Sequence, residues 1–380
     1  MAEWVAVSLT DGSLISDLPL LSVESVGASM GRYETSTASL PIASGKAPAD
    51  WVRATKPKVS ALILLDDNPL DVAHGIPVWG GMVNRRDRSH QETVQLDLIT
   101  IEGYFDQRYV GDVTFAGVPE CTIIEELVEA YAADGSNGGI PIRVQQVGDL
   151  GQARDREYLD SYDKTLYSAI RDLAGVIDGP EWYVGWEWQY SPDRLTPVLY
   201  VGDRVGTSVA EGLAPVAVFD VPGAGTEFDL VEDYGIGRGA NDVMATSSGE
   251  GDSRPQSSHM LFADPERPTF ELRFSPSSSI KEISTLDGHA EARLQSTRRG
   301  TTSIAISANL KAAPRLGVDW GIGDEVGVAV GGIAFDGTET VPSIPGGIEG
   351  RGRVAGWKRS LMEPQTITPL IVSETGAFDA

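Results

Sequence analysis

The chain has 380 residues, which at the usual ~150 residues per domain predicts two to four domains with cores large enough to fold without disulfides. Asp and Glu number 55 against 30 Lys and Arg, for a formal net charge of −25. This acidic balance argues against a nucleic-acid or anionic-membrane binder, because both need a basic face. The 43 glycines and 22 prolines predict many turns and a β-rich fold.

The single cysteine, Cys121, excludes an intrachain disulfide and a cysteine metal cluster, and fits a reducing compartment. We expect Cys121 to be a buried small apolar residue. Residues 1–11 lack the basic start and apolar run of a signal peptide, and no stretch approaches the ~18 apolar residues of a membrane span. The composition therefore predicts a soluble protein, made in the cytoplasm, with no membrane span.

Residues 1–112 show short apolar segments separated by turns. Several segments alternate apolar and polar residues, which is typical of half-buried strands, and Asp11-Gly12 is a turn signal. The predicted strands cover residues 4–7, 23–26, 35–42, 59–65, 79–83 and 94–98. This pattern predicts a first β-barrel or sandwich domain over 1–112.

Residues 113–212 predict a mixed α/β domain. One helix is expected over 122–134, with Thr122 and Glu125 as a capping box and Gly135 as its stop. A second is expected over 163–177, with Asp163 as its cap. Strands are expected at 183–188 and 198–201.

The remainder of the chain returns to strands, interrupted by one insertion. A second β domain is predicted from 213–245 together with 300–380. The insertion, 246–299, combines a Ser-, Gly- and acid-rich loop at 246–258 with a helix over 285–295, which Gly288 weakens.

Two segments at opposite ends of the chain resemble each other. Laid over 352–370 without a gap, residues 81–99 give five identities in nineteen positions. The pairs are Gly81 with Gly352, Val83 with Val354, Arg88 with Arg359, Ser89 with Ser360 and Glu92 with Glu363, and Leu96 also meets Ile367. A duplicated β domain would explain this match, and so would chance similarity between two amphipathic strands.

Motifs for catalysis and metal binding lack their required contexts. Ser29 lies in a Gly-x-Ser-x-Gly pattern, but strand-like residues follow it where a nucleophile elbow needs a helix, so a turn between strands is predicted. The four histidines do not form an i, i+4 pair, and no Cys-x-x-Cys exists to complete a zinc site. These histidines are His74, His90, His259 and His289. We predict no catalytic residue, no metal site and no enzyme activity.

Glycine-rich motifs for nucleotides and calcium are also incomplete. Residues 235–239 lack the strand–helix frame of a dinucleotide fold, and Gly45-Lys46 lacks the other residues of a phosphate loop. Residues 134–138 lack the later glutamate of a calcium loop. No cofactor is predicted.

The most unusual segment, residues 181–188, holds three of the eight tryptophans. Glu181 and Glu187 would lie near 20 Å apart along one strand, too far for the carboxylate pair of a glycosidase. Trp182, Trp186 and Trp188 are expected on the same face as these glutamates. Such an aromatic stripe is typical of a core or subunit contact, and a sugar platform is the alternative.

Several short motifs follow one another in a consistent order. They are residues 79–83, 98–108, the helix 163–177 with 178–182, then 239–243, 286–294 and 323–326. In this order the chain resembles tailed-phage minor tail proteins of the baseplate hub type, especially those of siphophages infecting actinobacteria. The resemblance covers nearly the whole chain and implies an α+β, mostly β fold, with two β-barrel-like tube domains and mixed α/β inserts.

The resemblance also implies a function in the virion. It implies a homotrimeric hub at the tail tip that joins the hexameric tail tube to the receptor-binding apparatus and conducts DNA without sequence-specific binding. The implied partners are further copies of the chain, the distal tail protein, the tape measure protein and other tail-tip or fibre proteins. An acidic lumen would repel phosphates. A carbohydrate-binding or cell-wall-degrading tail module stays open as the alternative.

Overall fold

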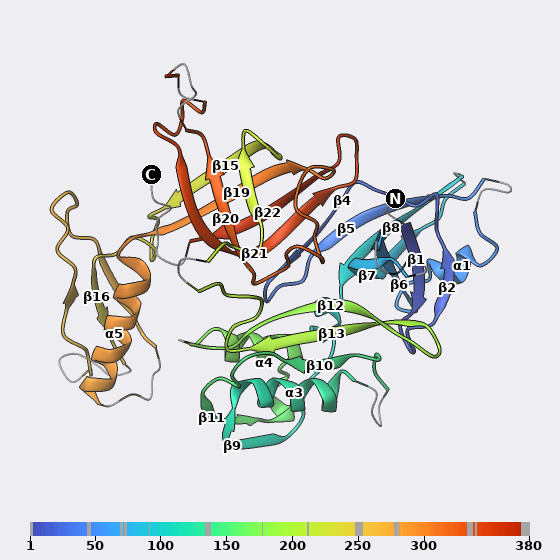
Figure 1. Ribbon diagram of the computed structural model, residues 1–380. Helices are drawn as coiled ribbons and strands as arrows, with labels where there is room; N and C mark the ends of the chain where they lie inside the picture. The colour runs from blue at the N-terminus through green and yellow to red at the C-terminus, as the bar shows by residue number, and fades with distance from the viewer. Residues whose placement is uncertain are drawn as a thin grey trace.

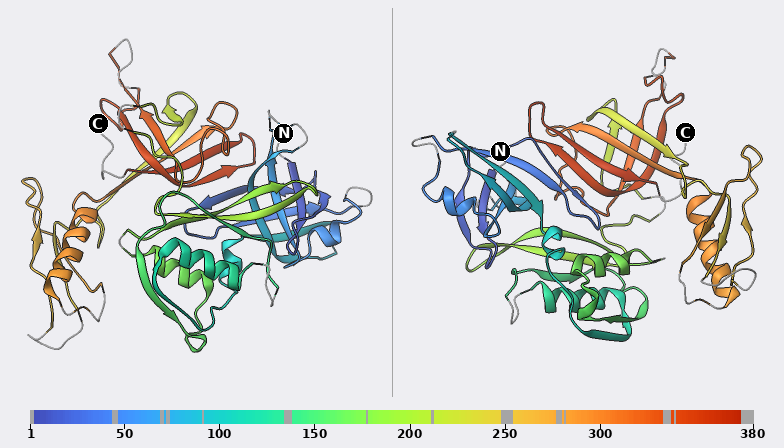
Figure 2. Two further views of the ribbon diagram at one scale, coloured as in Figure 1. Left: turned by 60° about the horizontal axis from the view of Figure 1, so that its bottom comes forward. Right: turned by 180° about the vertical axis from the view of Figure 1, so that it is seen from behind.

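The computed structural model describes residues 3–43, 47–68, 71, 74–90, 92–133, 138–176, 178–210, 213–247, 254–276, 280, 282–332, 337–338 and 340–373. The fold is mostly β, as predicted. Two large curled sheets lie side by side, a mixed α/β layer lies beneath them, and a small helical unit projects from one end (Figure 1). Two further views show the same arrangement (Figure 2).

The first sheet is built from the N-terminal part of the chain. Its seven strands run in the order β2-β1-β6-β7-β8-β5-β3. Their bounds are β1 Glu3–Ser8, β2 Leu14–Asp17, β3 Ser22–Val23, β5 Thr35–Pro41, β6 Ser60–Asp66, β7 Ile76–Asp87 and β8 Thr93–Thr100. In β5 and β8 buried residues alternate with more exposed ones, as period-two strands require. Two short helices, α1 (Trp51–Ala54) and α2 (Glu102–Phe105), accompany this sheet.

The second sheet draws mainly on the C-terminal part of the chain. Six strands run in the order β14-β20-β21-β22-β19-β15, and β4 (Ser25–Ser29) joins as a seventh by pairing with β21. The other bounds are β14 Val218–Val221, β15 Gly225–Asp233, β19 Thr301–Asn309, β20 Glu325–Val330, β21 Ile348–Ser360 and β22 Thr366–Val372. We predicted that residues 1–112 form a domain by themselves. This is wrong, because β4 pairs with β21 of the second sheet.

The two sheets follow the same path. If β1, β3, β5, β6, β7 and β8 are matched in chain order to β14, β15, β19, β20, β21 and β22, the six matched strands have the same order in both sheets, and β2 at the edge of the first sheet has no counterpart. They differ at one edge, where β1 pairs antiparallel with β6 but β14 pairs parallel with β20.

The likeness extends to irregular features of β7 and β21. Each strand has a bulge directly after a matched valine, Val83 or Val354. The carbonyl of Val83 accepts a hydrogen bond from Lys58 N, and that of Val354 accepts one from Gly323 N, both with positive φ. The predicted gapless alignment therefore describes β7 and β21 well.

The same alignment is wrong for the returning strands. In the gapless alignment Arg86 of β7 corresponds to Trp357 of β21. Leu96 lies opposite Arg86 and Pro369 lies opposite Trp357, so Leu96 corresponds to Pro369 and not to Ile367. The second hairpin is two residues longer between these pairs, which shifts β22 along the alignment without changing which face is buried.

The mixed layer comprises residues 113–202. Its strands and helices are β9 (Val113–Pro119), α3 (Glu120–Tyr131), β10 (Arg143–Gln146), β11 (Ala153–Tyr158), the 3₁₀ turn Asp160–Tyr162, α4 (Leu166–Ala174), β12 (Glu181–Gln189) and β13 (Arg194–Gly202). Both predicted helices exist, but their caps differ. The α3 helix begins at Glu120 after Pro119, with no side-chain cap, and Thr165 caps α4 in place of Asp163. Residues 134–137 and 177 lie outside the described residues.

The projecting unit comprises β16 (Asp242–Ala245), β17 (Met260–Leu261), β18 (Glu271–Phe274) and α5 (Ile283–Thr297). It has its own small core, in which Leu286, Ala290 and Leu294 of α5 face the strands. The predicted helix is therefore present and longer than expected. The predicted boundary at 245 is wrong, because β16 pairs with β17 and β18 of this unit.

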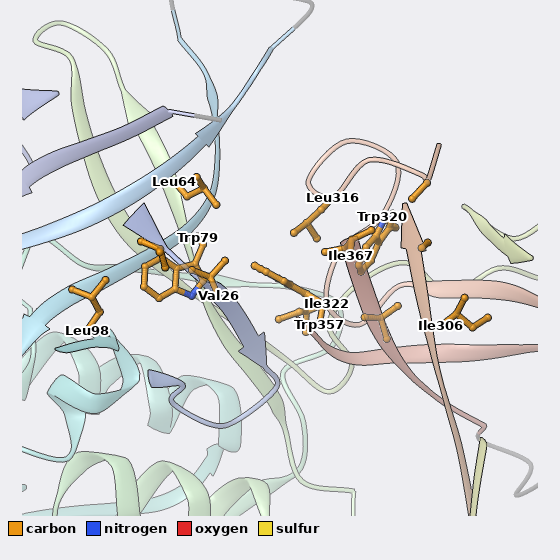
Figure 3. Close-up of a cluster of buried hydrophobic side chains, with 14 of the residues drawn as sticks. Val26, Leu64, Trp79, Leu98, Ile306, Leu316, Trp320, Ile322, Trp357 and Ile367 are labelled. Carbon is orange, nitrogen blue, oxygen red and sulfur yellow. The ribbon is translucent and has the colours of Figure 1, made fainter. Parts of the chain in front are cut away.

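One continuous core joins the two large sheets. It includes Trp79 and Leu98 of the first sheet and Trp357 and Ile367 of the second. Figure 3 shows these side chains facing one another, with Val26 of β4 beside Trp79. A separate core lies between the first sheet and the mixed layer. No helix among the described residues is long and apolar enough to cross a membrane.

Candidate assembly site at the junction of the two sheets

The junction between the sheets is formed by the pairing of β4 with β21. Ser25 to Ser29 run antiparallel to Gly356–Ser360, with Val26 opposite Arg359. Since β4 follows β3 directly in sequence, the chain leaves the edge of the first sheet and continues as a strand of the second. This crossover holds the relative orientation of the two sheets.

Glycines allow the backbones to approach closely at this junction. A Cβ atom at Gly27 would lie 2.9 Å from the carbonyl oxygen of Trp357, and one at Gly356 would lie 2.8 Å from that of Ala28. The indole Nε1 of Trp79 donates a hydrogen bond to Gly27 O at 2.9 Å. A larger residue at either glycine would push β4 away from β21.

A buried ion pair crosses the same junction. The guanidinium of Arg359, only 2% exposed, binds both carboxylate oxygens of Asp66, with Nη1–Oδ2 at 2.6 Å and Nη2–Oδ1 at 2.9 Å. Asp66 ends β6 of the first sheet, while Arg359 lies in β21 of the second. The two residues are 293 positions apart in the chain, so sequence periodicity offers no signal for the pair.

A second ion pair fixes the mixed layer to the second sheet. Arg353 of β21 donates to both oxygens of Glu181 at 2.5 and 2.8 Å, and Nη2 also donates to Val205 O at 2.7 Å. Glu187 at the other end of β12 binds Arg143 and accepts from Tyr200. Both glutamates of the aromatic segment are therefore engaged in structural contacts.

Glu102 is a buried carboxyl between the first sheet and the mixed layer, with one oxygen unpaired among the described residues. It is buried at the start of α2, where Oε1 accepts from Val184 N of β12 at 3.3 Å, and Oε2 has no hydrogen-bond partner among the described residues. Burial raises the pKa of Glu102 to about 7, and Glu34 adds to the rise, while hydrogen bonds involving Thr100 oppose it.

The tryptophan stripe is inside the protein. Trp182 is 1% exposed and Trp186 is 8% exposed, both in the core beneath the first sheet, and Trp188 packs at its margin. A Cβ at Gly80 would lie 2.3 Å from Nε1 of Trp186, which shows how closely β7 approaches β12. The two buried indoles thus have almost no surface to offer to a glycan or a second subunit.

The predicted face of this stripe also needs correction. Trp182 and Trp186 lie in the core between the first sheet and the mixed layer, whereas Tyr183 packs against the core of the two large sheets and Glu181 binds Arg353 of the second sheet. Even and odd positions of a strand point to opposite faces, so the tryptophans and the glutamates do not share one.

Ser29 ends β4 and is not at the start of a helix. Its hydroxyl donates to Glu34 Oε1 at 2.6 Å. The Gly-x-Ser-x-Gly pattern therefore belongs to a strand end followed by a turn, which agrees with the rejection of a nucleophile elbow.

We expect Ser29→Ala to leave the oligomeric state unchanged and to lower the free energy of unfolding by roughly 1 kcal/mol, the value of one partly exposed hydrogen bond. Urea unfolding and size exclusion would measure both quantities. Loss of a measurable esterase or peptidase activity in this variant would contradict a structural role for Ser29.

Other predicted positions have structural contacts. His74 lies between Asp71 and Asp193 and contacts Trp188, while His259 contacts Asp242. Among the described residues, no group of three or more His, Cys, Asp or Glu is placed to hold a metal ion. Cys121 is buried as predicted, and burial raises its pKa to about 11. Gly45-Lys46 and residues 134–137 lie outside the described residues.

The fold as a whole is similar to that of solved tail proteins. The chain superposes on the 43 kDa tail protein of prophage MuSo2 from Shewanella oneidensis with a TM-score of 0.59 at 12% identity, covering 99% of this chain and 100% of that one. The tail protein from Neisseria meningitidis MC58 gives 0.57 at 12%, covering 98% and 96%. Prophage tail protein gp18 from Listeria monocytogenes EGD-e gives 0.52 at 10%, covering 97% and 94%. No family model and no curated protein matches the sequence.

Proposed function

We propose that this chain is a structural protein of a phage tail tip. The observation that carries the proposal is the pair of sheets with one strand order, in a chain whose full length has the fold of prophage tail proteins. A rigid junction between two equivalent sheets suits a structural part, because it fixes the angle at which the sheets are presented.

The more specific proposal is a trimeric baseplate hub. Three chains with two equivalent sheets each would present six similar units to the hexameric tail tube and threefold symmetry to the tip. Its partners would be the distal tail protein, the tape measure protein and other tail-tip or fibre proteins. The excess of carboxylates, at −25 per chain, would let DNA pass through a lumen without sticking.

We expect the purified chain to form a trimer of about three times its 40.5 kDa mass. Like-charged subunits repel, and physiological salt screens this repulsion over a Debye length of about 8 Å, so assembly should strengthen from low to moderate ionic strength. Size exclusion with light scattering at both ionic strengths would measure this. A hub imaged in the particle with six copies, or with one, would overturn the proposal.

A further inference from the structure

The far end of β7 is open on one side. On that side β6 pairs with β7 only from Ile76 to Met82, and no strand of the described residues pairs with residues 84–87 there. The matched stretch of β21, Gly356–Ser360, carries β4 on this side. One of the two matched sheets therefore has this position filled by a strand of the same chain, and in the other no strand of the described residues fills it.

The strand ladders identify which residues correspond to β4 in the second half. Ala38 of β5 lies opposite Leu96, which corresponds to Pro369 of β22. The register of β19 with β22 places Ile306 opposite Pro369, so Ala38 corresponds to Ile306. Val23 of β3 pairs with Ala38, and Phe228 of β15 pairs with Ile306. Val23 therefore corresponds to Phe228, and β4, which follows Val23, corresponds to the second half of β15.

Three residues further along, Val26 corresponds to Val231. Val26 lies opposite Arg359, and in the gapless alignment Arg359 corresponds to Arg88, the residue directly after β7. The internal equivalence thus predicts a register in which Val231 lies opposite Arg88. Val26 is 2% exposed in its filled position, whereas Val231 is 45% exposed.

The second half of β15 is suited to such pairing. β15 is the edge strand of its sheet, and among the strands that the structure describes it pairs only with β19. In the predicted register, Asp233 lies opposite Arg86 and Asp229 lies opposite His90, so both carboxylates lie diagonal to Arg88. Arg86 also donates to Val52 O and Thr55 Oγ1 of its own chain, and Asp233 binds Arg238, so Arg88 supplies most of the charge attraction at this edge. Opposite charges on neighbouring strands stabilise a sheet, and they favour this edge over a random one.

We propose that the free side of β15 in one copy of this chain pairs antiparallel with the end of β7 in a second copy, with Val231 opposite Arg88. The inference rests on the proposed assembly, because it supplies the contact between chains. The two surfaces are different, so the contact is head-to-tail, and three such contacts would close the ring of the proposed trimer. Each ring contact repeats the arrangement that β4 and β21 make inside the chain.

The test is the full chain with Arg88→Cys and Val231→Cys, oxidised mildly at the concentration and salt that give the oligomer. Opposed residues of antiparallel strands have Cα atoms about 4.5 to 5.5 Å apart, within the range of a disulfide. We expect covalent dimers and trimers on a non-reducing gel, with nothing larger, and their return to monomers on reduction. Either single variant alone should give none, and a mixture of the two should give dimers only.

The matched control is Arg88→Cys with Val218→Cys. Val218 is a valine of similar exposure, 48%, on β14 at the opposite edge of the same sheet. We expect roughly tenfold less covalent product from this pair, since disulfides need close Cα atoms. A trimer by light scattering without Arg88–Val231 links, or with equal linking in the control, would overturn this contact alone. A chain that is monomeric and unlinked under all conditions would overturn both the contact and the trimer.

Discussion

Replacing Glu102 with glutamine is expected to remove a strong pH dependence from the stability of this protein. The pKa of Glu102 rises from 4.5 to about 7 on folding, because the carboxyl is buried with one oxygen unpaired. Below pH 4.5 the group is protonated in both states and has no effect. As the pH rises from 4.5 to about 7, the unfolded chain loses a proton that the folded chain keeps, so the free energy of unfolding falls. It levels off above pH 7, where the carboxyl is ionised in both states.

The predicted fall is about 2.5 kcal/mol between pH 5 and pH 8, at 1.36 kcal/mol per unit of pKa shift. Urea unfolding gives the free energy of unfolding of wild type and of Glu102→Gln at each pH. The difference between the two free energies should change by this amount from pH 5 to pH 8, since the other titrating groups are common to both proteins. The glutamine itself adds a pH-independent cost for its buried amide. Glu126→Gln on the exposed face of α3 is the control. Parallel pH profiles for wild type and Glu102→Gln would rule out a buried titrating carboxyl.

Asp66→Asn is expected to destabilise the junction of the sheets by about 3 kcal/mol, because it leaves the guanidinium of Arg359 buried without its counter-charge. Arg359→Met should cost less. The side chain of Asp66 is 28% exposed and can be hydrated when its partner is removed, and the methionine fills the apolar space. The double variant should be more stable than Asp66→Asn alone, since the unpaired charge is then absent.

The midpoint and slope of urea unfolding at one protein concentration would give these free energies. Glu271→Gln is the control, because the Glu271–Arg273 pair is solvent-exposed and should change stability by less than about 0.5 kcal/mol. Equal losses for Asp66→Asn and Arg359→Met would contradict the asymmetry, and a loss as small as that of the control would show that the pair does not hold the junction.

Local patterns in the sequence predicted most of the elements correctly. Alternation at 35–42 and 94–98 predicted strands, and the apolar periodicity of 122–134 and 163–177 predicted helices, because one buried face imposes period two or 3.6. The helix caps were wrong because many Thr and Asp residues could serve, and only backbone geometry selects one. Short strands such as β2, β10 and β17 were missed, since four or fewer residues carry little pattern.

Sequence by itself also determined the mostly β class and the alignment of β7 with β21, because apolar alternation and turn residues are local patterns. Whether that alignment reflects duplication or chance similarity was decided by the matching strand order and bulges of the two sheets. The tertiary structure alone decided that β4 crosses into the second sheet, that Arg359 meets Asp66, and that Trp182 and Trp186 lie in a core. Each of these depends on contacts between distant segments, where the same strand pattern is compatible with several partners. Pairing is then selected by the packing of whole sheets and the compensation of buried charge, neither of which is encoded in any short segment.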